Sequence, residues 1–288
     1  MTLKQLFKSI LYFFKDMGIL LSPIIAGVSF ANLHEPWQNF INRYFITIVV
    51  TTLILSALIT ILMRIINVFK NNIKIKFNNP DFEVEVKFGD LFKEKNNIVV
   101  GFNNYFDTSL GEIISKQSVQ GQFEQICYCN NVEKLDNDIK NALKRKRVFA
   151  NNVNNDKTKG KKKQFPVGTT VAVENNEQKF FLCAYSSMNN DTKAESNIKD
   201  FCSSLTCLWE ELRIENQCLS ISIPVMGTGL SRLPSNKMEL LITIIMHFIA
   251  SSREQIITKK LTVVLNKKDK KEYNLSKIET ILKEISEN

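Results

Sequence analysis

The clearest strand pattern in the chain is an alternation of apolar and polar positions over residues 219–225. Leu219, Ile221, Ile223 and Val225 alternate with two serines and a proline, and this period of two predicts a strand. The strand runs into Gly227, Thr228, Gly229 and Leu230, and an apolar-periodic helix is predicted over residues 237–249. Closely spaced glycines expose backbone N–H groups to an anion, and phosphates bind between a strand end and a helix start. The pattern therefore predicts a phosphate-binding loop, with a ligand-free tight turn as the alternative.

The remaining periodicity predicts a domain that mixes strands and helices. Two of its short elements are expected to be a helix over residues 111–116 and a loop over 118–121. A strand hairpin followed by alternating strands and helices predicts an α/β fold, a mixed β-sheet flanked by helices. The predicted strands are 73–78 or 82–88, 98–103, 165–173, 179–185 and 259–265, and the other predicted helices are 132–149, 196–212 and 275–285.

The first 70 residues hold the longest apolar runs. Residues 44–63 contain no charge and, at 1.5 Å per residue, would span the roughly 30 Å of a bilayer core. A weaker run covers residues 17–33, with a re-entrant segment as its alternative. Lysines and arginines at both outer ends favour a cytoplasmic N-terminus and a cytoplasmic C-terminal domain. We therefore expect a helical transmembrane hairpin in residues 1–70, a cytoplasmic domain in 71–288, and a multi-pass location in the inner membrane.

Charge and cysteine content narrow the possible partners. The net charge is +9, and a basic cluster at 144–163 contains Lys144, Arg145, Lys146 and Arg147. The run at 150–163 is expected to be a solvated loop, with contact to anionic membrane lipids next. The cluster lacks interleaved aromatic residues, so nucleic acid is not an expected partner. The six cysteines form no CxxC pair and only two histidines are present, so we expect no metal site. Four cysteines, at 183, 202, 207 and 218, are expected to be buried thiols.

Several motifs, in their order along the chain, resemble a known fold. Gly89-Asp90-Leu91 resembles the adenine-contacting turn of the macro domain, the ADP-ribose-binding fold, and residues 98–103 resemble its Asn-terminated strand. Residues 224–230 resemble its second phosphate loop. A narrower series, at 104–108, 113–115 and 118–121, resembles the transmembrane–macro effectors of type II Thoeris antiphage systems. The resemblance covers roughly residues 80–285.

The resemblance implies a function that the periodicity alone does not give. It implies that the macro domain binds an ADP-ribose-type signal. A TIR-domain partner would make this signal, and an amino-acid adduct of ADP-ribose is one form that the signal could take. A homo-oligomer would then rearrange and disrupt the membrane, killing the infected cell. No nucleophile–base pair is evident, so we expect a binding protein without a cofactor or catalytic residue rather than an enzyme. A membrane-tethered ADP-ribosyl hydrolase and a tethered nucleic-acid binder remain alternatives. The implied ligand-binding residues are Asp90, Leu91, Asn103, Asp107, Thr108, Ser118, Val119, Gln120, Gly121, Gly227, Thr228, Gly229 and Leu230.

Overall fold

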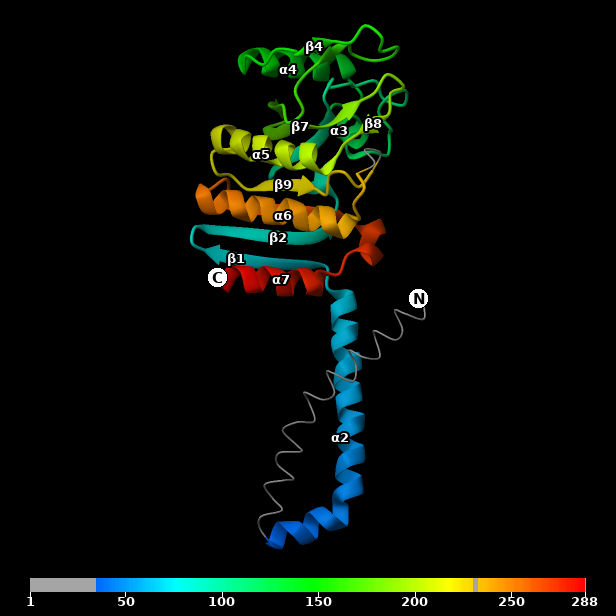
Figure 1. Cartoon of the computed structure of the whole chain (residues 1–288), viewed down its shortest axis with the longest axis vertical. Helices are drawn as coiled ribbons and strands as arrows, with labels where there is room; N and C mark the ends of the chain where they lie inside the picture. Colours follow the sequence, from blue (N-terminus) through cyan, green and yellow to red (C-terminus); the bar gives the residue numbers. More distant parts are fainter. Residues whose placement is uncertain (1–34, 230–232, 288) are drawn as a thin grey trace. The chain divides into compact units, whose positions relative to one another are not determined.

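A computed structural model describes residues 35–229 and 233–287 (Figure 1). The chain divides into two compact units, Met1–Lys70 and Asn71–Asn288. In the first unit, helix α2 covers Glu35–Phe69. Thr51 and Thr60 donate hydroxyl hydrogen bonds to carbonyls four residues earlier in α2, both at 2.8 Å. Many large apolar side chains of α2 are exposed, including Ile46, Leu55 and Leu58.

The prediction of a multi-pass membrane protein is corrected here. Within the described ranges, no helix combines the length and the apolar character needed to cross a membrane. The expected inner-membrane location and the span at 44–63 are therefore wrong, and the span at 17–33 lies outside the described residues.

The second unit is built on one mixed sheet. Across the described residues the sheet has eight strands in the order β1-β2-β10-β9-β3-β7-β6, with β8 paired to β7. Five neighbouring strands, from β2 to β7 in that order, run parallel, and the pairs β1–β2 and β7–β6 at its two ends are antiparallel. The strands are β1 Asn72–Asn78, β2 Asp81–Gly89, β3 Asn97–Asn103, β6 Thr170–Asn175, β7 Gln178–Met188, β8 Ala194–Glu195, β9 Ile221–Pro224 and β10 Lys260–Asn266.

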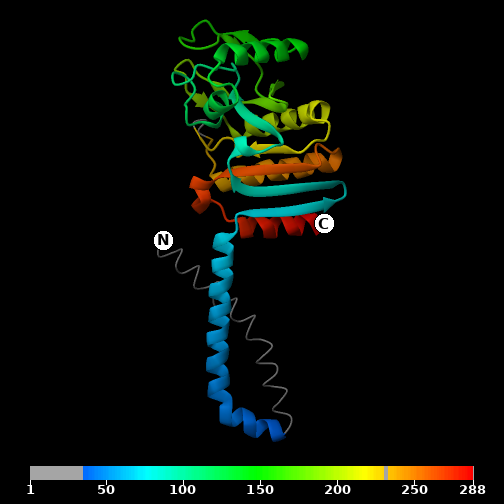
Figure 2. The ribbon, with the colours of Figure 1, turned by 180° about the vertical axis from the view of Figure 1, so that it is seen from behind.

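Helices cover both faces of this sheet because its central strands are apolar on both faces. On β3, Val99 joins one core, whereas Ile98, Val100 and Phe102 join the other. The Val99 core is closed by α5 Ile198–Glu215, α6 Lys237–Glu254 and α7 Leu275–Glu287 (Figure 1). The opposite core is closed by α3 Val119–Cys127 and α4 Val132–Arg145, and Figure 2 views the domain from behind.

Most predicted elements form, and the differences have local causes. The hairpin of β6 and β7 is confirmed, and its turn is made by Asn176 and Glu177, both with positive φ. No helix forms over 111–116, where Gly111 has φ 83° and a bridge joins Leu110 to Ile114. The predicted loop at 118–121 is instead the start of α3, which Ser118 caps. Among the cysteines, Cys183 is buried as expected but Cys207 is exposed.

Candidate ligand site at the carboxyl edge of the sheet

The parallel strands bring several predicted site residues to one edge of the sheet. The carboxyl ends of β2, β9 and β3 are Gly89, Pro224 and Asn103. After β9 the chain passes through α6 to β10 on one side, and after β3 it passes through α3 and α4 to β6 and β7 on the other. Adjacent parallel strands whose connections leave in opposite directions make a crevice at their carboxyl ends, where ligands bind in open α/β sheets.

Asn103 at the end of β3 has one half of its amide fixed and the other half unused. Its Oδ1 accepts hydrogen bonds from the backbone N–H groups of Tyr105, at 2.9 Å, and Asp107, at 3.4 Å. Its Nδ2 is buried and has no hydrogen-bond partner among the described residues. An unpaired buried donor is costly, and such groups in native proteins call for a partner. Nδ2 is therefore the donor of this amide that the described part of the chain leaves unpaired.

Asp107, which the resemblance assigned to the ligand, is instead held by the protein. Its Oδ2 lies 2.6 Å from Lys157 Nζ, and its Oδ1 accepts the Lys161 backbone N–H at 2.7 Å. The side chains of Asp107 and Lys157 are both 0% exposed. Burial lowers the pKa of Lys157, while the facing Asp107 carboxylate acts in the opposite direction. Each carboxylate oxygen therefore already has one partner within the protein.

The loop over 150–163 closes on this carboxylate, so the expectation of a solvated loop is wrong for Lys157 and half-buried Lys161. Lys161 Nζ donates to the Phe106 carbonyl at 2.5 Å and to Asp136 at 2.6 Å. Gly160 has φ 82°, and a Cβ there would lie 2.3 Å from Asp107 Oδ1. A side chain at this position would collide with the carboxylate that the loop encloses. The short strands β4 Asn152–Val153 and β5 Lys163–Gln164 pair at the base of the loop.

The other predicted residues between β3 and α3 have structural hydrogen bonds. Thr108 Oγ1 donates to Asp136 Oδ1 at 2.6 Å, and Ser118 Oγ accepts the Gly121 N–H at 3.0 Å. Gln120 Nε2 donates to the Asp107 carbonyl at 2.6 Å. A Cβ on Gly121 would lie 2.2 Å from the Ser115 carbonyl oxygen, so this glycine allows close packing within the chain. Val119 is the first residue of α3, whose N-terminus carries a partial positive charge.

Asp90 and Leu91 lie next to the carboxyl end of β2. Asp90 is exposed, and its Oδ1 accepts the Phe92 N–H at 3.1 Å, which caps the short 3-10 helix Leu91–Lys93. Leu91 is buried in the core on the α3 and α4 side of the sheet. One oxygen of Asp90 thus has a structural partner, and Leu91 contributes packing.

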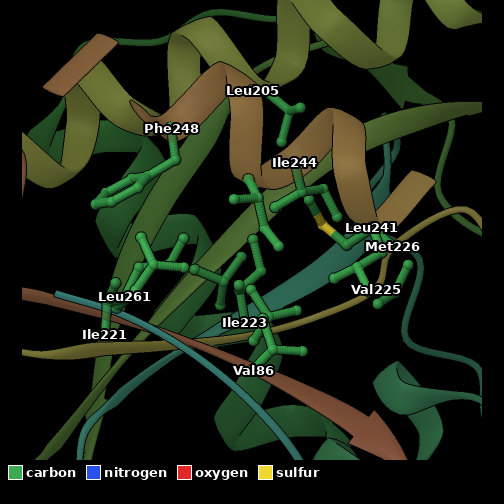
Figure 3. Close-up of a cluster of buried hydrophobic side chains, with 14 of the residues drawn as sticks. Val86, Leu205, Ile221, Ile223, Val225, Met226, Leu241, Ile244, Phe248 and Leu261 are labelled. Carbon is green, nitrogen blue, oxygen red and sulfur yellow. The ribbon is translucent and has the colours of Figure 1, made fainter. Parts of the chain in front are cut away.

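The glycine loop after β9 is anchored by the core before it becomes exposed. Val225 and Met226 lie among the apolar side chains of α6, beside Leu241 (Figure 3). Gly227 is buried with φ 83°, and a Cβ there would lie 2.4 Å from Leu233 Cδ1. Thr228 is half-buried, and its Oγ1 donates to the Val225 carbonyl at 3.0 Å. At exposed Gly229 a Cβ would meet no described atom within 4 Å, and Leu230 lies outside the described residues.

Glu124 on α3 is a buried carboxyl group beside this network. It is 1% exposed; its Oε1 accepts from Gln120 Nε2 at 3.0 Å, whereas its Oε2 has no partner among the described residues. Burial raises the pKa of Glu124 to about 7. In the folded state this side chain therefore stays mostly protonated at pH values below about 7.

This raised pKa predicts a pH dependence of stability. The pKa of Glu124 is about 7 in the folded state and near 4.5 in the unfolded state. The protonated side chain therefore contributes its full stability below pH 4.5, and this stability is lost as the pH rises through about 7. Between pH 5 and pH 8, we expect the wild-type free energy of unfolding to fall by about 1–3 kcal/mol relative to that of Glu124→Gln. Urea unfolding at both pH values measures this difference. Glu133→Gln, at an exposed position on α4, should follow the wild type, and parallel curves for wild type and Glu124→Gln would contradict the prediction.

A cavity of about 450 Å³ lies away from this edge of the sheet. It runs beside β6, between α4 and the end of α5, and contains none of the predicted site residues. Side chains of both charge signs line it, and Lys179 is paired there with Glu215 at 3.7 Å. In the described part of the chain, no cluster of three or more metal-binding side chains occurs.

Sequence reasoning missed the partners that fix the end of β3. Lys157 lies 50 residues from Asp107, and Lys161 lies 25 residues from Asp136 and 55 from the Phe106 carbonyl. Both lysines stand inside a run of lysines with no apolar pattern. The isolated Gly160 among these lysines is the one local signal of a required turn. Glu124 falls in a helix whose start was predicted as a loop, so its burial could not be inferred.

Comparisons with known proteins agree with this architecture. The family described as "Thoeris protein ThsA, Macro domain" matches residues 84–266. Thoeris protein ThsA of Bacillus amyloliquefaciens (strain Y2) is 30% identical over 231 residues, which cover 78% of this chain and 75% of that protein. The Oceanobacillus iheyensis macrodomain with ADP superposes with a TM-score of 0.50 at 16% identity, covering 75% of this chain and all of that one. The same macrodomain with MES bound gives a TM-score of 0.50 at 15% identity, covering 74% of this chain and 99% of the other. These structural likenesses concern the fold.

Proposed function

Because the chain belongs to the macro-domain family of the Thoeris antiphage defence protein ThsA, we propose that its macro domain binds an ADP-ribose-type signal at the carboxyl edge of the sheet. The observation that carries the proposal is Asn103, the last residue of β3, whose fixed Oδ1 leaves a buried Nδ2 without a partner among the described residues. A ribose hydroxyl is an acceptor suited to that donor. The exposed Gly229 backbone across the crevice supports placing the diphosphate at 227–230.

The signal is proposed to come from a TIR-domain partner, and its binding to change how protomers associate. A ligand shifts a conformational equilibrium only by its difference in affinity for the two states, so the ligand-bound form must favour one homo-oligomer arrangement. The group attached to ADP-ribose is left open, with an amino-acid adduct as one form. Membrane disruption is not retained, since the membrane location that it requires has been corrected above.

Titration of the full chain with ADP-ribose tests the binding step. Asn103→Asp keeps an acceptor for the N–H groups of Tyr105 and Asp107 but replaces the unpartnered donor with an oxygen. We expect saturable binding by the wild type and a loss of affinity of at least about tenfold in Asn103→Asp, the equivalent of one good hydrogen bond. Calorimetry measures affinity, and light scattering of the same samples measures the change in oligomer size. Equal affinities would reject the assigned role of Asn103.

A second variant pair tests the glycine loop without relying on Asn103. Gly229→Ala adds a Cβ that meets no described atom within 4 Å, so the fold and binding should persist. Gly229→Glu adds a carboxylate at the same open position and should weaken binding by about tenfold or more through repulsion of the diphosphate. Wild-type protein that fails to bind ADP-ribose at millimolar concentration would contradict the proposal. Turnover of an ADP-ribosylated protein in parallel assays would favour the hydrolase alternative.

A further inference from the structure

Breaking the buried ion pair between Lys157 and Asp107 should disturb its surroundings more than breaking a surface ion pair would, because both side chains are fully buried. Lys157 Nζ is bound on three sides: to Asp107 Oδ2 at 2.6 Å, to the Lys161 carbonyl at 3.0 Å, and over the Tyr105 ring at 4.0 Å. The Tyr105 hydroxyl in turn accepts a hydrogen bond at 3.1 Å from Nδ2 of Asn154, which belongs to the same 150–163 loop as Lys157. The loop thus holds both residues whose N–H groups fix the Asn103 side chain.

The backbone of Asp107 is the link between this ion pair and the proposed site. Its N–H donates to Asn103 Oδ1, and its carbonyl accepts from Gln120 on α3. Without Lys157, the Asp107 carboxylate would be buried without its ionic partner and would have to turn toward water or take up a proton. Either change loosens the turn at 104–107, and the Asn103 amide is then free to rotate.

We propose that Lys157 is a positioning residue for ligand binding: by neutralising Asp107 it holds the turn that orients the unpartnered Nδ2 of Asn103. This inference rests on the proposed function. The chemistry requires no direct contact between Lys157 and the ligand, because the side chain is 0% exposed. A basic loop that the sequence marks as solvent-facing is, at this one lysine, an internal support of the site.

Amide hydrogen exchange and ADP-ribose titration of the full chain test the proposal together. In Lys157→Met, the N–H groups of Tyr105 and Asp107 should exchange at least about tenfold faster, while Val84 and Val86 in the core of β2 stay as in the wild type. Affinity for ADP-ribose should fall by about tenfold or more. Adding Asp107→Asn to Lys157→Met removes the unpaired charge and should restore both measurements to within about threefold of wild type. Lys159→Met is the matched control, since Lys159 is exposed and pairs with Glu112 on the surface.

The readouts separate failure of this inference from failure of the proposed function. Unchanged exchange at Tyr105 and Asp107 in Lys157→Met overturns the positioning role, whether or not ADP-ribose binds. Unchanged affinity in a folded Lys157→Met variant overturns it as well. Wild-type protein that does not bind ADP-ribose overturns the role in ligand binding together with the proposed function, while the exchange result still decides whether Lys157 holds the turn. Should Lys157→Met not fold, Asp107→Asn alone replaces it, and equal behaviour of that variant and the double variant overturns the proposal.

Discussion

Phe123→Ala should destabilise the macro domain by about 3–5 kcal/mol, the range for removing a large buried aromatic side chain. Phe123 on α3 is 0% exposed, and its ring centroid lies 5.0 Å from that of Phe180, 5.3 Å from Tyr128 and 6.3 Å from Phe102. These rings join α3 to strands β3 and β7 and to the residue that follows α3. The substitution removes several aromatic contacts at once and leaves a cavity that rigid strands cannot fill.

The measurement is chemical unfolding of the full chain, with a control on the same helix. Ile126 also lies on α3 but is 54% exposed, so Ile126→Ala should change the free energy of unfolding by no more than about 0.5 kcal/mol. Phe123→Leu, which keeps most of the volume, should fall between the two. Similar losses for Phe123→Ala and Ile126→Ala would contradict the assignment of α3 to the core. Because α3 carries Gln120, Phe123→Ala should also weaken ADP-ribose binding.

The fold could be predicted from the sequence because its signals are local. The period of two in 219–225 and the apolar periodicity of 237–249 both formed the expected elements, β9 and α6. Asn236 and Glu239 form a reciprocal capping box, a start signal that depends on residues three positions apart. The glycine loop at 227–229 was predicted from a strand end that precedes a helix, whereas Asp90 and Asn103 came from the resemblance to the macro domain.

The partners of the site residues could not be predicted because they depend on distant parts of the chain. Asp107 and Thr108 were expected to face the ligand, yet Lys157 and Asp136 already bind them. Nothing local distinguishes Lys157 from the exposed lysines around it. The uncharged run at 44–63 was likewise an incomplete guide. It lies within α2, yet among the described residues no helix is long and apolar enough to cross a membrane.

Breaking the Asp107–Lys157 pair from the carboxylate side should have an effect as large as that of Phe123→Ala. Asp107→Ala leaves an ammonium group buried without its anion, and removing one partner of a buried pair costs about 3–5 kcal/mol. Replacing both partners, in Asp107→Leu combined with Lys157→Met, leaves no buried charge and should recover most of that loss. Unfolding measurements on Asp107→Leu alone, Lys157→Met alone and the double variant give the coupling energy directly.

The same loop contains the control for this cycle. Lys159 and Glu112 are 3.0 Å apart, but their side chains are 56% and 57% exposed. Water screens such a pair, so Glu112→Ala should cost at most about 1 kcal/mol. The two pairs differ chiefly in burial, and comparable losses for Asp107→Ala and Glu112→Ala would show that the loop does not close over Asp107 in solution. A large loss confined to Asp107→Ala would place the electrostatic support of the Asn103 side chain in the interior of the domain.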